Sequence, residues 1–417
     1  MRIVEQQVLD FIDGDGLIAA VQDLIAVPSV GGAETAAQEH IAALLELVGM
    51  RLDAWEIDVD AVTRHPACSY EVDRSTALGV VGSYGGSAGP RLVLNGHIDV
   101  VPVGDPGRWT HDPWRGTTVG DRLYGRGSAD MKAGLLAGVF AVKAIADAGV
   151  ELAGAVDVWS VIGEEDGGMG TLATLLRGHT GDAAIVMEPT EMTVAAAQAG
   201  ALGFRVTVPG LAAHGCVRRE GVSAVEKFTE VHAALLELEA RRNERVCDPM
   251  FADYELPVAL SIGCVNAGDW ASTVPESLVF TGRYGVAVGE TLDEAVAEFE
   301  AAVAHVVARD PWLSRNPPVV EWSGGRFAPV LSPPTDLIPT LRDALPAAGG
   351  PPGRVRGITY GSDLRLLVDE GGIPGVLFGP GDVRVAHQTD EYVPVSDVVT
   401  TARALALTAL RFCGVAP

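Results

Sequence analysis

The stretch Arg91-Leu92-Val93-Leu94-Asn95-Gly96-His97-Ile98-Asp99 indicates both how this chain folds and where its chemistry lies. Its apolar run, residues 92–94, predicts a buried strand, because short apolar runs bounded by turn residues are typical of strands inside a sheet. An imidazole and a carboxylate, His97 and Asp99, follow the end of that run. Alternate residues of an extended chain lie on one side, so we expect the Asp99 carboxylate to hydrogen-bond the His97 ring and to orient it as a metal ligand.

Strand and helix patterns alternate on both sides of this stretch. Helical spacing is seen in two pieces within residues 15–50; further helices are expected at 133–148 and 172–176, and further strands at 79–81, 156–162 and 183–187. This alternation predicts an α/β fold, a mostly parallel sheet sandwiched by helices. Sites in such sheets lie beyond the carboxyl ends of the strands.

The pattern changes near residue 199. A strand at 203–208, a helix at 223–241, strands at 258–265 and 277–284 and a helix at 292–307 follow one another. This β-α-β-β-α order predicts a small ferredoxin-like α+β domain. We therefore expect a discontinuous larger domain, residues 1–198 and 322–417, with a smaller domain inserted at 199–321.

Composition narrows the class of protein. A chain of 417 residues exceeds one ordinary core, and its formal charge of −25 disfavours nucleic acid and anionic membranes as partners. The five cysteines are scattered and never in C-x-x-C spacing, which favours reduced thiols. The polar start, residues 1–7, does not resemble a signal peptide, so we expect a cytoplasmic protein.

Four further segments carry side chains that bind metals or move protons. Asp130 follows a glycine-rich loop, Glu164 and Glu165 follow one predicted strand, Glu188 follows the next, and His387 lies far along the chain. Taken singly, each has an ordinary explanation, such as a helix cap for Asp130 or a solvated turn for the glutamates. Their shared position at predicted strand ends favours one common site.

This set suits two divalent cations, zinc in preference to cobalt. One cation would use His97 and the other His387, each with a glutamate, and Asp130 would bridge them at roughly 3.5–4 Å. The remaining Glu164 is then placed to take a proton from a water molecule and pass it to a leaving amine.

The sequence resembles a family of dinuclear zinc amidohydrolases that includes acetylornithine deacetylase, succinyl-diaminopimelate desuccinylase, aminoacylase and glutamate carboxypeptidase. The matching segments are G-H-I-D-V-V-P (96–102), G-R-G-S-A-D-M-K-A-G (125–134), G-E-E-D-G-G (163–168), M-E-P-T (187–190), A-A-H-G (212–215), S-T-V-P (272–275) and A-H-Q-T-D-E-Y-V-P (386–394). The resemblance implies a metal-ligand set of His97, Asp130, Glu165, Glu188 and His387. It also implies that Asp99 supports a ligand, that Glu164 is the general base, that the larger domain is catalytic, and that the inserted domain, 199–321, is a lid that forms a homodimer.

Further site residues follow from the same resemblance. His214, which by itself would have a structural role, matches a histidine that stabilises the developing oxyanion, usually in the partner subunit's site. Arg283 matches an arginine that binds a substrate carboxylate; the alternative is a solvated charge on a strand. Gly361 and Ser362 lie in a loop expected to line the substrate pocket.

The expected reaction is hydrolysis of the amide of an N-acyl amino acid or a related small molecule, as in acetylornithine deacetylase. Four positions depart from the family pattern and argue against desuccinylase specificity: Arg218, Ser223, Ala271 and Gly361. A dipeptidase or carboxypeptidase of the same family, and a deacylase in a specialised biosynthetic pathway, stay open as alternatives. A non-catalytic relative is disfavoured, because this chain retains Glu164 and every implied ligand.

Overall fold

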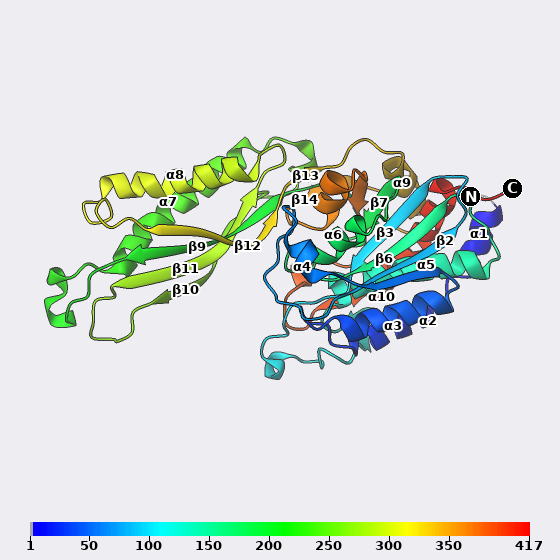
Figure 1. The fold of residues 1–417 in the computed structure, drawn as a ribbon, viewed down its shortest axis with the longest axis horizontal. Coiled ribbons are helices and arrows are strands. Elements are labelled where there is room, and N and C mark those ends of the chain that lie inside the picture. The colour runs from blue at the N-terminus through cyan, green and yellow to red at the C-terminus, as the bar shows by residue number, and fades with distance from the viewer. Residues whose placement is uncertain (1–2) are drawn as a thin grey trace. The chain divides into compact units, whose positions relative to one another are not determined.

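The computed structural model describes residues 3–417, apart from the side chains of 323 and 324, and divides into two compact units (Figure 1). The first comprises the chain up to Ala196 with Ser332–Arg356 and Ser362–Pro417. The second comprises Ala197–Leu331 with Gly357–Gly361. It extends past residue 321, the boundary expected from the sequence, because the strand β12 (Val319–Phe327) pairs with β9 (Gly200–Pro209).

The first unit is built on a sheet that is parallel at its centre. The strands run in the order β1 (Arg51–Glu56), β2 (Leu78–Gly85), β6 (Ala155–Val161), β3 (Arg91–His97), β7 (Ala183–Val186), β15 (Gly375–Leu377), β8 (Val194–Gln198) and β13 (Val330–Leu331), with β14 (Val355–Ile358) beside β8. Strand β3 pairs in parallel with β6 and β7, and β7 with β15, whereas the outer pairs are antiparallel. The predicted mostly parallel sheet is therefore confirmed for the strands that matter to the site.

Helices cover this sheet. They are α1 (Ile3–Asp10), α2 (Gly14–Ile25), α3 (Thr35–Leu47), α4 (Val59–Thr63), α5 (Ala133–Asp147), α6 (Met169–Leu176), α9 (Leu337–Ala347) and α10 (Val395–Phe412). Helix α5 packs closely on the end of β7, since a Cβ at Gly134 would lie 2.0 Å from the Met187 carbonyl oxygen. A small antiparallel sheet joins β16 (Tyr392–Pro394), β5 (Arg122–Tyr124) and β4 (Thr117–Val119).

The second unit is an antiparallel sheet with two helices. Its strand order is β10 (Leu260–Ala267), β11 (Ser277–Val286), β9 and β12, and its helices are α7 (Ala224–Arg245) and α8 (Leu292–Arg309). Phe204 and Phe280 from the strands and Phe299 from α8 form the centre of its core. The predicted ferredoxin-like element order is therefore found, with β12 as the fourth strand.

Among residues 3–417, no helix combines the length and the apolar character that crossing a lipid bilayer requires.

Candidate metal centre

Three strand ends bring the predicted side chains to one edge of the first unit's sheet. His97 is the last residue of β3, the pair Glu164–Glu165 lies in the loop after β6, and Glu188 lies just beyond β7. Because β3, β6 and β7 are parallel, their carboxyl ends meet at this edge. His387 joins them from the loop before β16, with a φ of 59°, a left-handed conformation that is uncommon for a residue other than glycine.

Asp130 lies between the two histidines. Its Oδ1 is 3.1 Å from His97 Nε2, and its Oδ2 is 3.4 Å from His387 Nε2. It does not cap α5, whose N-cap position is Lys132. The two oxygens of this carboxylate are thus turned to different imidazoles, the arrangement expected of a bridging ligand.

Each histidine also has a glutamate beside it. Glu188 Oε1 is 3.8 Å from His97 Nε2, and Glu165 Oε1 is 3.1 Å from His387 Nε2. The possible ligand atoms of His97, Asp130 and Glu165 lie within 4.8 Å of one another, and so do those of His97, Glu164 and Glu188. Imidazole nitrogens and carboxylate oxygens in this number suit zinc and similar divalent ions.

The electrostatics of the cluster favour the binding of cations. Burial, reinforced by neighbouring carboxylates, raises the pKa of Glu164 and of Glu188 well above their usual range. Hydrogen bonds to Asp130 and Glu165 raise the pKa of His387 to about 11. The buried Oε1 of Glu164 has no hydrogen-bond partner among the described residues. Such crowding of carboxylates is costly unless cations bind there, so the residues present fit a dinuclear metal site.

The role of Asp99 differs from the sequence-based expectation. His97 Nδ1 donates to the main-chain carbonyl of Asp99 at 2.9 Å and is 3.6 Å from its Oδ1. The Asp99 carboxylate instead accepts the backbone N–H groups of Glu164, at 3.3 Å, and Glu165, at 3.1 Å. The carbonyl sets the histidine tautomer, and the carboxylate holds the turn that carries both glutamates.

Sequence reasoning missed Glu391, which holds the loop that carries Asp130. Its buried carboxylate accepts hydrogen bonds from Arg126 Nη1 at 2.6 Å and from the backbone N–H groups of Gly127, Ala129 and Asp130 at 3.1, 2.9 and 3.1 Å. Its position in the same motif as His387 was a usable signal, since a carboxylate that collects several N–H groups fixes a loop.

Arg74 was also missed, and it supports the other acidic loop. Its guanidinium is buried between Glu34, at 2.7 Å, and Asp166, at 2.8 Å. Because Asp166 follows Glu165 directly, this ion pair anchors the turn from a segment more than ninety residues earlier. A lone arginine in a polar stretch carries no pattern that would reveal this partner.

His214 lies in the second unit. The segment 212–215 pairs with 272–275: the Gly215 N–H donates to the Ser272 carbonyl at 2.7 Å, and that of Val274 donates to Ala213 at 2.9 Å. Two motifs found separately in the sequence are thus brought together. The Cys216 N–H donates to His214 Nδ1 at 3.2 Å, so in a neutral ring the proton is on Nε2.

The three expected substrate-binding residues have different surroundings. Arg283 on β11 donates to the Thr359 carbonyl at 2.9 Å, and among the described residues no carboxylate pairs with it. Gly361 lies against Phe327, because a Cβ there would come within 2.5 Å of the Phe327 Cβ. Ser362 is fully buried, and its hydroxyl accepts the Leu364 N–H at 3.1 Å. Arg283 therefore has donors for a ligand, whereas Gly361 and Ser362 shape the loop.

Comparison with known proteins yields one family and many relatives. Residues 93–411 match Peptidase family M20/M25/M40. The N-formyl-4-amino-5-aminomethyl-2-methylpyrimidine deformylase of Halalkalibacterium halodurans is 28% identical over 422 residues, covering 95% of this chain and 94% of the relative. The acetylornithine deacetylase of Edwardsiella ictaluri is 27% identical over 409 residues, covering 95% and 97%.

Solved structures share the fold at low identity. A dipeptidase from Saccharomyces cerevisiae superimposes with a TM-score of 0.76 at 14% identity, covering 98% of each chain. A protein from Bacillus subtilis described as a dinuclear metal binding peptidase superimposes with a TM-score of 0.62 at 16% identity, covering 96% of this chain and 98% of its own. These likenesses establish the architecture.

Proposed function

The chain belongs to Peptidase family M20/M25/M40, whose members are hydrolases that act on amide bonds, and we propose that it hydrolyses the amide of a small N-acylated molecule. The observation that carries the proposal is the Asp130 carboxylate, with an oxygen toward each of two histidine–glutamate pairs. Glu164 lies within the same cluster, and its buried Oε1 has no hydrogen-bond partner among the described residues.

The residues that would hold two divalent ions are His97 and Glu188 on one side of Asp130, and His387 and Glu165 on the other. Zinc is the ion that best suits this donor set, with cobalt as a substitute. When bound, such ions polarise an amide carbonyl and lower the pKa of water.

Glu164 is the proposed proton carrier. Burial raises the pKa of Glu164, which favours its acting as a proton acceptor toward water, and its buried Oε1 has no hydrogen-bond partner among the described residues. The water oxygen forms a bond to the acyl carbon, the carbon–nitrogen bond breaks, and the proton held by Glu164 passes to the leaving nitrogen. The products are a carboxylic acid and an amine. His214, with its Nε2–H available, is the proposed donor to the oxyanion.

We also propose that the enzyme is a cytoplasmic homodimer that associates through its second unit. Strand β10 is an outer strand of the four-stranded sheet, and Val265 on it and Trp270 after it are 49% and 74% exposed. Mixing inactive Glu164→Ala and His214→Ala protomers tests whether His214 acts across subunits. Recovery of activity on subunit exchange is expected, and failure despite proven exchange would argue for action within one subunit.

The substrate class has two candidates. Arg283, which has no paired carboxylate among the described residues, favours an N-acyl amino acid, as in acetylornithine deacetylase. The name of a deformylase relative favours a formamide of an aminomethylpyrimidine. Dipeptides, cleaved by the same reaction, are the family alternative.

A substrate panel with metal analysis tests the proposal. The purified protein is stripped with a chelator, reloaded with zinc or cobalt, and assayed on N-acetyl amino acids, an N-formyl aminomethylpyrimidine and dipeptides. We expect no activity without metal, and after reloading hydrolysis of one acyl class above the dipeptides. Full activity of the metal-free protein would overturn the assignment. Arg283→Met should raise KM selectively for substrates that carry a carboxylate.

A further inference from the structure

The second unit contains a cavity of about 490 Å³ that the proposed reaction does not use. It is formed by the end of α7, the loop that follows with its short helix Pro249–Phe251, the turn at 287–290, and one side of α8. All of its lining residues belong to this unit. Its volume is that of a pocket for a small organic molecule.

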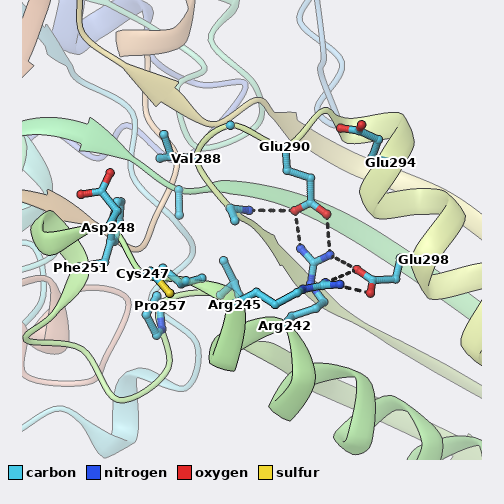
Figure 2. A pocket seen from close by; sticks show the side chains of 15 residues that line it. Arg242, Arg245, Cys247, Asp248, Phe251, Pro257, Val288, Glu290, Glu294 and Glu298 are labelled. Atoms are coloured by element: carbon cyan, nitrogen blue, oxygen red, sulfur yellow. Dashed lines mark hydrogen bonds and ion pairs between the residues drawn. The ribbon is translucent and has the colours of Figure 1, made fainter.

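The cavity has two chemically different sides. Val246, Phe251, Pro257 and Val288 contribute apolar surface, and Phe251 belongs to a small buried cluster that includes Val246 and Val288. Figure 2 shows Val288, Phe251 and Pro257 together, and the arginines and glutamates of α7 and α8 across from them. A ligand that fits both sides needs an apolar body and a polar or charged group.

The sign of that charge follows from the ion pairs. Arg242 donates to both oxygens of Glu290, at 2.7 and 2.6 Å, and to Glu298 at 2.7 Å, while Arg245 donates to Glu298 at 2.8 and 2.7 Å. Two guanidinium groups are therefore matched by two carboxylates.

Two further carboxylates line the cavity without a cation. Asp248 Oδ1 accepts the Met250 N–H at 2.9 Å, and Glu294 caps α8 through Thr291. Neither has an ion pair among the described residues, so the lining has four carboxylates and two guanidinium groups. A positively charged ligand is favoured over a negative one.

The walls are fixed without a ligand. The Asn243 side chain accepts a hydrogen bond from the Val258 N–H at 3.0 Å and donates one to the Val258 carbonyl at 3.2 Å. The Tyr254 hydroxyl donates to the Gly357 carbonyl at 3.1 Å, and Arg242 Nη2 to that of Gly285 at 2.9 Å. A cavity held open in this way spares a ligand the cost of ordering it.

We propose that this cavity is a binding site for a small organic cation with an apolar body, an arylalkyl or alkyl amine. The body packs on Val246, Phe251 and Val288, and the positive charge is favoured by the net negative lining that Asp248 and Glu294, on different sides of the cavity in Figure 2, provide. The site is independent of the amide hydrolysis proposed above.

Cys247 gives a local readout, because it lines the cavity and is exposed. The full-length protein is treated with iodoacetamide in the presence of 2-phenylethylamine, and alkylation of each cysteine is followed by mass spectrometry. With a dissociation constant of about 1 mM, a probe concentration of about 5 mM should slow alkylation of Cys247 about sixfold. Cys264, exposed in the single chain and outside the cavity, is the internal control: the proposed dimer contact through β10 would lower its reaction rate, but that rate should be the same with and without the amine.

Two comparisons separate the proposed chemistry from simple hydrophobic filling. The anionic 3-phenylpropionate and the neutral 2-phenylethanol should protect Cys247 less than about twofold. The double variant Asp248→Asn, Glu294→Gln keeps the oxygens that cap both helices and removes both charges, and it should lose the protection by the amine.

Absence of protection by the amine, equal protection by the acid, or equal protection of Cys264 would overturn the proposal. So would full protection in the double variant. Retained secondary structure of the variant by circular dichroism shows that a loss reflects the charges and not unfolding.

Discussion

Two regions of the molecule gather acidic side chains but balance their charge differently. One is the metal centre, and the other is the Arg242 cluster, in which Arg242 and Arg245 pair with Glu290 and Glu298. At the metal centre, Glu164 and Glu188 are buried and Glu165 is partly buried, and desolvation raises the pKa of each. In the second unit, partial burial by itself would raise the pKa of Glu298. Hydrogen bonds from Arg245 and Arg242 outweigh that effect and lower the pKa. The first cluster therefore needs a cation from outside, and the second contains its own.

This difference separates a binding site from a structural ion pair. Carboxylates that meet arginines can remain ionised, and they hold elements together when partly buried. Carboxylates that meet only histidines and one another store unfavourable electrostatic energy, which metal binding relieves. Ion pairs still have a part at the metal centre, where Arg74 and Arg126 fix the loops beneath the ligands.

The largest expected effect lies at the metal centre. Glu164→Gln should lower kcat about a thousandfold, because the proton carrier is lost, while the zinc content is unchanged. Steady-state kinetics with elemental analysis measures both. The exposed Glu39→Gln should behave as the unchanged protein; a Glu164→Gln variant with near-normal kcat would remove Glu164 from the mechanism.

The second prediction concerns the loss of an arginine from the Arg242 cluster. Arg242→Met leaves Glu290 and Glu298 without their buried cation and should lower the free energy of unfolding by about 3 kcal/mol. Arg245→Met should cost at most about 0.5 kcal/mol, because the Arg245 side chain is 60% exposed. Urea unfolding compares the two, and equal effects would show that burial does not distinguish these arginines.

The third prediction concerns a residue that supports a ligand. Glu391→Gln removes the negative charge that accepts hydrogen bonds from Arg126 and from the N–H groups around Asp130. The substitution should weaken zinc binding about tenfold to hundredfold. Competition with a chromogenic chelator measures this affinity. Asp147→Asn, in an exposed pair with Lys143, should leave it unchanged; an equal loss there would argue against the loop as the cause.

The smallest expected effect is a pH dependence of the metal-free protein. The raised pKa values of Glu164 and Glu188, ordinarily 4.5, mean that the folded state binds protons more tightly than the unfolded state, so stability falls as pH rises above that value. His387 has the same sign: its stabilisation is present below 6.5 and is lost as pH rises through about 11. The pKa of Asp130 is lowered, which matters only below its ordinary value of 3.8.

Thermal unfolding of chelator-treated protein should therefore show Tm falling from about pH 6 to about pH 9, and zinc should flatten this trend because the ions replace the protons. Variants at Arg242 should shift Tm without changing its slope with pH. A metal-free Tm that rises over this range would contradict the electrostatic description of the cluster.

Much of the site could be predicted from the sequence because its ligands follow short, regular elements. His97 ends β3 and Glu188 follows β7, and an apolar run before a polar side chain is visible without a structure. The expected hydrogen bond from the His97 ring to the Asp99 carboxylate was wrong, because His97 Nδ1 donates to the Asp99 main-chain carbonyl. Alternation along a strand predicts which face a side chain occupies, but not which acceptor is nearest. Glu391 and Arg74 were missed because their partners are main-chain groups or distant residues.

The class of fold and the side chains that meet at the sheet edge could be predicted from the sequence alone. Those properties depend on the local periodicity of apolar residues and on the chemical type of each side chain, and both are visible within a short segment of sequence. Three further features are visible only in the folded chain: Asp130 turns one oxygen to each histidine, Glu391 accepts hydrogen bonds from four donors, and the second unit's arginines are neutralised by Glu290 and Glu298 beside an open cavity. These depend on distances between residues far apart in the chain, which packing sets and local sequence does not record.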